Sequence, residues 1–165
     1  MAGHVVAGHV VKQTIDIRAP AEAIFDLLSD PAQHVKIDGS TAGGGGSAMV
    51  RRLRRGPARL SMGSTFTMSM RLFGVPYRVT NRVVEFEPNR LIAWRHFESQ
   101  HWRYELEPVA GGTEVTESFD YSYWPMFGRW FIRLLGWPGR NQRAIAQTLL
   151  RLKADAEHRT GDASR

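Results

Sequence analysis

The chain has 165 residues, 42% of them hydrophobic and 23% charged, which suits one globular domain with a full core. It contains no cysteine, so disulfide bonds, thiolate nucleophiles and cysteine-ligated zinc are excluded. The formal net charge is +6 and the pI is about 10.3, a balance that suits an anionic partner but equally a compositional preference for arginine.

The start of the chain predicts a strand, a corner and a short helix. Side chains in residues 10–18 alternate between a polar face and a mostly apolar face, which is typical of a strand with one side on a core. Pro20 favours the first position of a helix, where its missing N–H costs nothing, and apolar residues follow at helical spacing. Asp30 and Pro31 predict the start of a second short helix.

Residues 48–59 are rich in arginine and predict a strand. One interpretation is an anion-binding or membrane-surface patch. The other is a solvated edge strand that uses charge to prevent aggregation, and we favour it. No aromatic residue lies in this segment, so we expect no nucleic-acid partner. The arginines concerned are Arg51, Arg52, Arg54, Arg55 and Arg59.

Residues 64–123 predict an antiparallel meander of short strands joined by tight turns, with one face in water. The register of residues 77–87 is ambiguous, and a bulge near Asn81 or Arg82 would reconcile its two apolar patterns. The other face of this meander is unusually aromatic, so we expect it to point inward.

The order of the elements resembles a known superfamily. A strand that ends in Ala19 and Pro20, a short helix with Phe25, an Asp-Pro pair, a meander and a long helix over 141–158 are similar to the SRPBCC group, which includes the START lipid-transfer domains. The resemblance covers residues 8–157 and is closest to the polyketide cyclase/dehydrase-like branch. It implies an α+β helix-grip fold, in which an antiparallel sheet wraps around the C-terminal helix and leaves an internal cavity.

This resemblance implies a single domain over residues 8–157 with flexible termini at 1–7 and 158–165. Residues 1–11 contain no Lys or Arg and no long apolar run, and no window reaches the roughly 18 apolar residues of a membrane-spanning helix. We therefore expect a soluble, cytoplasmic protein that is a monomer or a homodimer.

The resemblance also implies that the cavity binds a hydrophobic or aromatic small molecule, polyketide-, lipid- or steroid-like, for transport or sequestration. The alternative is a polyketide cyclase/dehydratase-type enzyme that moves protons in the same cavity. Residues 124–137 mix aromatics with arginines and predict a lid over the mouth, an interfacial membrane contact, or a short helix packed on the sheet. The candidate ligand-binding residues are Phe66, Met68, Trp94, Trp102, Tyr104, Phe119, Tyr121 and Trp130.

Two residues are candidates for acid–base catalysis. Strict alternation places Glu117 on the inner face, where burial would raise its pKa and suit it to be a general acid or base. Alternatively, Glu117 pairs with Arg78 or Arg82, or points outward. His96 shares an inward face with Trp94; it would transfer a proton or bond a ligand carbonyl, unless it is a satisfied core histidine.

The sequence carries no strong catalytic motif: HExxH, the P-loop and GxSxG are all absent. The glycine run at 43–46 lacks the lysine of a phosphate loop. The histidines include no pair at the i, i+4 spacing of a helical metal site, and His34 and Asp38 are predicted to lie across a helix end. We therefore expect no metal and no cofactor.

Overall fold

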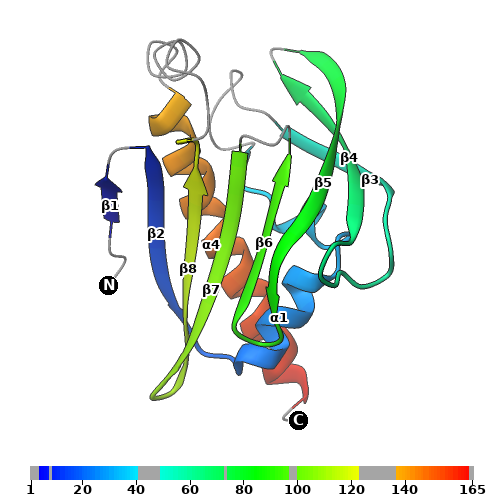
Figure 1. Cartoon of the computed structure of the whole chain (residues 1–165). Coiled ribbons are helices and arrows are strands. Elements are labelled where there is room, and N and C mark those ends of the chain that lie inside the picture. The colour runs from blue at the N-terminus through cyan, green and yellow to red at the C-terminus, as the bar shows by residue number, and fades with distance from the viewer. Residues whose placement is uncertain are drawn as a thin grey trace.

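In the described part of the chain, an eight-stranded antiparallel sheet wraps around one long helix (Figure 1). The computed structural model describes residues 4–7, 9–40, 49–72, 74–96, 100–122 and 137–163. The strands are β1 (His4–Ala7), β2 (Val10–Ile17), β3 (Met49–Arg55), β4 (Thr65–Leu72), β5 (Val75–Glu87), β6 (Leu91–His96), β7 (Gln100–Val109) and β8 (Gly112–Asp120). The helices are α1 (Ala21–Ser29), α2 (His34–Ile37) and α4 (Trp137–Ala163). The strand order β1-β2-β8-β7-β6-β5-β4-β3, around one long helix, confirms the α+β helix-grip fold.

The opening strand and helix form as alternation and helical spacing predict. In β2 the side chains of Val11 and Ile17 are buried, whereas Lys12 on the other face is exposed. Pro20 lies one residue before α1 with an extended backbone, not at the first helical position as predicted. Its carbonyl oxygen accepts the first helical hydrogen bonds, from the N–H groups of Ala23 and Ile24. The apolar face of α1 packs against α4 and β7 and closes one end of the fold.

The second short helix begins later than predicted. Asp30 and Pro31 lie in a turn, and α2 starts only at His34. The Asp30 carboxylate accepts hydrogen bonds from the Ala32 backbone N–H at 2.9 Å and the Gln33 side chain at 3.1 Å. Asp30 therefore organises this turn through its side chain, as aspartate commonly does.

A bulge in β5 explains its ambiguous pattern, but it lies further along the strand than predicted. Pairing with β6 is regular up to Val83 and shifts before Glu85, so the extra residue is near Val84 and not near Asn81 or Arg82. Before the bulge, Asn81 and Val83 face inward. After the bulge the inner face passes to the even-numbered residues, which places Phe86 against the core.

Regular elements extend into both segments that the sequence predicts as flexible termini. The segment 1–7 was expected to be flexible, yet β1 pairs with β2 and places Val6 opposite Val11. The segment 158–165 was also expected to be flexible, yet α4 continues to Ala163. In this last turn the His158 Nδ1 lies 3.2 Å from the carboxylate of Asp162, four residues further along.

The arginine-rich segment forms the edge strand β3, as the favoured interpretation predicts. Arg51, Arg52, Arg54 and Arg55 are exposed, and the pairing of β3 with β4 shifts register twice. Charge and bulges both discourage another strand from pairing with this edge. Arg59 has a different role, because its guanidinium bonds the Asp26 carboxylate and the Ser29 hydroxyl and so holds the β3–β4 connection against α1.

The buried core lies between α1, the sheet and the middle of α4. The apolar side of α4 is buried from Ala144 and Ile145 to Ala156. Residues 124–136 lie outside the described residues, so the interpretations of that segment stay predictions. No helix in the described ranges is long and apolar enough to cross a membrane.

Candidate ligand-binding cavity

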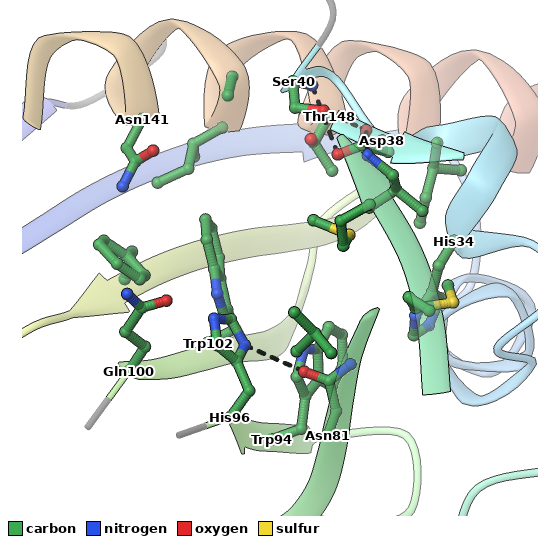
Figure 2. A pocket seen from close by; sticks show the side chains of 18 of the residues that line it. His34, Asp38, Ser40, Asn81, Trp94, His96, Gln100, Trp102, Asn141 and Thr148 are labelled. Carbon is green, nitrogen blue, oxygen red and sulfur yellow. Dashed lines mark hydrogen bonds between the residues drawn. The ribbon is translucent and has the colours of Figure 1, made fainter. Parts of the chain in front are cut away.

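A cavity of about 510 Å³ separates the inner face of the sheet from the N-terminal half of α4. Figure 2 shows Asn141 and Thr148 of α4 on one side and His96, Trp102 and Gln100 of the sheet on the other. No residue of α1 lines the cavity. Its lining consists of His34, Ile37, Asp38, Ser40, Val50, Phe66, Met68, Met70, Tyr77, Val79, Asn81, Trp94, His96, Gln100, Trp102, Tyr104, Glu117, Phe119, Asn141, Ala144, Ile145 and Thr148.

Most residues singled out in the sequence lie together in this lining. Tyr121 does not line the cavity, although it was a candidate: it is 2% exposed and its ring stacks behind Phe119, with the centroids 5.9 Å apart. Alternation placed Tyr121 on the correct face, but it lies in the packed layer next to the cavity. Trp130 is outside the described residues. The candidates in the lining are Phe66, Met68, Trp94, His96, Trp102, Tyr104, Glu117 and Phe119.

The aromatic wall is built from interlocking rings. Trp94 stacks between His34, with centroids 4.8 Å apart, and Tyr104, at 5.5 Å. Phe66 meets the edge of Trp94 at 5.7 Å, and neighbouring strands bring Trp102 within 4.4 Å of Phe119. Such contacts fix ring positions and leave flat apolar surface toward the cavity.

Glu117 is the most unusual group in the lining. It lies opposite Tyr104 in the β7–β8 pairing, its side chain is 1% exposed, and its Oε2 has no hydrogen-bond partner in the described structure. Burial raises the pKa of Glu117 well above its usual value; a hydrogen bond with Tyr104 opposes this increase and the nearby charge of Asp38 adds to it. Arg78 and Arg82 are exposed on the opposite face of the sheet, so the alternative of an ion pair with either does not hold.

His96 also faces inward, near the end of β6. Its Nδ1 lies 3.0 Å from the Asn81 Oδ1, and this amide oxygen can only accept, so Nδ1 carries the proton (Figure 2). Burial lowers the pKa of His96 to about 4, despite a hydrogen bond with Gln100 that opposes the change. His96 is therefore a neutral imidazole at physiological pH.

His34 was not singled out as a site residue, although it lines the cavity. It is positioned by α2, where its Nε2 donates to the Leu28 carbonyl oxygen at 2.8 Å and its ring stacks on Trp94. Burial lowers the pKa of His34, and the Leu28 carbonyl and Asp30 only partly oppose this. Because His34 is far in sequence from the strands of the sheet, nothing in the sequence indicated that its ring lies against theirs.

Asp38 is a second carboxyl in the lining that sequence reasoning missed. It accepts hydrogen bonds from the Ser40 hydroxyl and from the backbone N–H of Val50 at 3.2 Å. Burial raises the pKa of Asp38, while these hydrogen bonds and the charge of Arg151 act in the opposite direction. Figure 2 shows Asp38 and Ser40 beside Thr148 of α4.

Gly39 is what allows Asp38 and Ser40 to approach the helix. Its N–H donates to the Thr148 Oγ1 at 2.9 Å, and a Cβ at this position would lie 2.3 Å from the Ala144 carbonyl oxygen. Only glycine fits such a backbone approach. The glycine between two polar residues was the one sequence signal that could have indicated this contact.

The polar side chains of the lining are largely bonded within the protein, so the surface they leave is mostly apolar. In the ranges that the structure describes, no group of three or more His, Asp or Glu side chains is placed to hold a metal ion. The arrangement can bind an apolar molecule and offer it a few hydrogen-bonding groups.

Comparison with known proteins identifies the family. The family described as "Polyketide cyclase / dehydrase and lipid transport" matches residues 8–157. The chain belongs to this family. An uncharacterized protein of Mycobacterium tuberculosis, Rv0088, is 37% identical over 145 residues, which are 86% of this chain and 62% of that protein. The chain thus spans less than two thirds of the length of this curated relative.

Solved structures share the fold at low sequence identity. Protein NE0264 from Nitrosomonas europaea has a TM-score of 0.69 and 14% identity, with coverage of 95% of this chain and 99% of that one. The Aha1 dimer from Colwellia psychrerythraea has a TM-score of 0.56 and 21% identity, with coverage of 90% and 96%. These similarities support the fold alone.

Proposed function

We propose that the protein binds a hydrophobic or aromatic small molecule, polyketide-, lipid- or steroid-like, in the internal cavity, for transport or sequestration. The observation that carries the proposal is a hollow of about 510 Å³ walled by stacked aromatic rings. Ligand pockets typically measure roughly 300–1,000 Å³ and are mainly apolar with a few placed polar groups. The family description, which includes lipid transport, agrees with this class of ligand.

Filling the cavity tests the proposal. Ala144 lines the cavity from α4, so Ala144→Phe places a ring in the space that a ligand would occupy. We expect the purified wild-type protein to retain or take up an apolar ligand, detected by native mass spectrometry and with an environment-sensitive fluorophore. Binding should weaken at least about tenfold in the variant, as the loss of about 1.4 kcal/mol implies.

The control is Leu150→Phe, at a residue of α4 that is 50% exposed and does not line the cavity. This variant also adds a phenyl ring to α4, but outside the cavity, and should bind the ligand as tightly as wild type does. Equal binding by Ala144→Phe and wild type would place the ligand elsewhere, and no binding by wild type across a lipid and aromatic panel would dismiss the proposal.

A cyclase/dehydratase-type enzyme is the second candidate function, favoured by the buried Glu117. With its raised pKa, Glu117 would be protonated and act as a general acid toward a carbonyl oxygen. The neutral His96 would be the base that removes a proton next to that carbonyl. The wall would hold a polyketone in a reactive conformation.

The expectations about location, oligomeric state and membrane contact stay predictions. They are a cytoplasmic location, a monomer or a homodimer, and contact of the β3 arginines with an anionic membrane. The solved Aha1 relative is a dimer.

A further inference from the structure

The described lining of the cavity lacks the Lys and Arg side chains that give the whole protein its positive charge. The chain contains 22 Lys and Arg residues against 16 Asp and Glu. In the described part of the chain, however, no Lys or Arg lines the cavity. The ionisable side chains of the lining are His34, Asp38, Tyr77, His96, Tyr104 and Glu117.

Glu117 presents an unsatisfied polar atom inside this lining. Its carboxyl bonds Tyr104, while Oε2 is buried and has no protein partner among the described residues. An unpaired buried polar atom costs roughly 1–3 kcal/mol, and a bound molecule that pairs with it would recover part of this cost. A neutral carboxyl has one O–H, and Oε2 is the oxygen that has no protein partner among the described residues.

A carboxylate ligand finds no favourable partner here. It would lose its hydration in an apolar wall, next to Asp38 and Glu117, and the described lining residues include no Lys or Arg to pair with it. An ammonium ligand would have to pair with the carboxylate of Asp38 or Glu117, and a buried ion pair desolvates two charges that water had stabilised. An uncharged ligand avoids both costs and can still accept a hydrogen bond.

We propose that the cavity selects uncharged molecules that present a carbonyl-type hydrogen-bond acceptor to Glu117, and that it rejects carboxylates such as free fatty acids. The inference rests on the proposed binding function and narrows its ligand class. It assigns Glu117 a role in specificity, whether or not a reaction follows.

Four probes with one ring system test the selection. They are 2-acetylanthracene, 2-ethylanthracene, anthracene-2-carboxylate and 1-(2-anthryl)ethylamine, and their intrinsic fluorescence reports binding to the whole chain. We expect the ketone to bind about 3- to 10-fold more tightly than the ethyl compound, which is the range of one net hydrogen bond. The carboxylate and the ammonium should bind at least about 30-fold more weakly than the ketone near neutral pH.

The outcomes separate this inference from the function on which it rests. Binding of the carboxylate or the amine as tightly as the ketone overturns the charge selection and leaves apolar binding standing. Equal binding of the ketone and the ethyl compound overturns the hydrogen bond to Glu117. Absence of binding by all four probes overturns the inference, and the proposed function is overturned only if the lipid and aromatic panel also shows no binding.

Two substitutions of Glu117 assign the preference to its side chain. Glu117→Leu removes the donor and the buried polar atom, so the protein should fold. In this variant the ketone and the ethyl compound should bind with about equal affinity. Glu117→Gln keeps an N–H donor of similar shape and should keep a preference of at least about threefold. The control Glu107→Gln lies on the same sheet with an exposed side chain and should match wild type. A ketone preference that survives in Glu117→Leu overturns the assignment.

Discussion

Replacing Glu117 with glutamine should change how the stability of the protein depends on pH. Burial raises the pKa of Glu117 in the folded protein, whereas the unfolded chain titrates near the usual value. Between these two pKa values the unfolded state binds fewer protons than the folded state, so increasing pH favours unfolding. This one group then lowers the free energy of unfolding by up to about 1.4 kcal/mol per pH unit.

Other buried groups make the comparison with glutamine necessary. The pKa values of His34 and His96 are lowered by burial, so both histidines cost stability as the pH falls below about 6.5. The pKa of Asp38 is raised, and its effect has the same sign as that of Glu117. Glutamine has nearly the same shape and does not titrate, so the difference between variant and wild type isolates Glu117.

The assay is urea denaturation of wild type and Glu117→Gln across a pH series. As the pH rises from about 5 to about 6.5, the variant should gain unfolding free energy relative to wild type, by at most about 1.4 kcal/mol per pH unit. Glu107→Gln, an exposed control, should show no such trend. A Glu117→Gln difference that stays constant over this range would mean an ionised carboxyl in the folded protein and would refute the reasoning from burial.

Two further predictions concern the backbone contact at Gly39 and the alternative function. Gly39→Ala should cost about 2–4 kcal/mol in urea denaturation, because its Cβ would lie within 2.4 Å of backbone atoms of α4. Gly161→Ala, in open space on the same helix, should instead be neutral or stabilising by up to about 1 kcal/mol, and an equal loss in both would contradict the contact. If the cavity catalyses enolisation, deuterium exchange next to the carbonyl of a bound 1,3-diketone, followed by NMR, should slow at least about 100-fold in Glu117→Gln and in His96→Gln. Exchange at the wild-type rate in both variants would dismiss these catalytic roles.

The sequence predicts the sheet side of the cavity well, because side-chain direction in a strand follows from alternation. Phe66, Trp94 and Glu117 were all placed on the inner face on this basis, and all three line the cavity. Alternation cannot distinguish a residue that borders a hollow from one in the adjacent packed layer, which is why Tyr121 was included. The bulge in β5 was predicted at the wrong position for a related reason. Two apolar patterns overlap over several residues of this strand, and only its pairing with β6 shows where one pattern gives way to the other.

The helix and loop side of the cavity could not be predicted in the same way. His34 and Asp38 lie in the lining because of the turn at 31–33 and the four-residue helix α2 that follows it. The direction of this segment depends on the packing of α2 against α4. Their polar neighbours suggested a helix end and gave no indication of an internal wall. β1 was missed because a four-residue strand leaves too short a pattern, although its pairing with β2 is regular.

The helix α4 borders the cavity near its N-terminus and packs against α1 further along. Around α1, buried residues such as Leu27 and Leu152 are fully enclosed and none of them lines the hollow. Nearer its N-terminus, α4 faces empty space at Ala144 and Thr148. Local opening needs less free energy where fewer apolar contacts are lost. We therefore expect local opening to require less free energy beside the hollow than around α1.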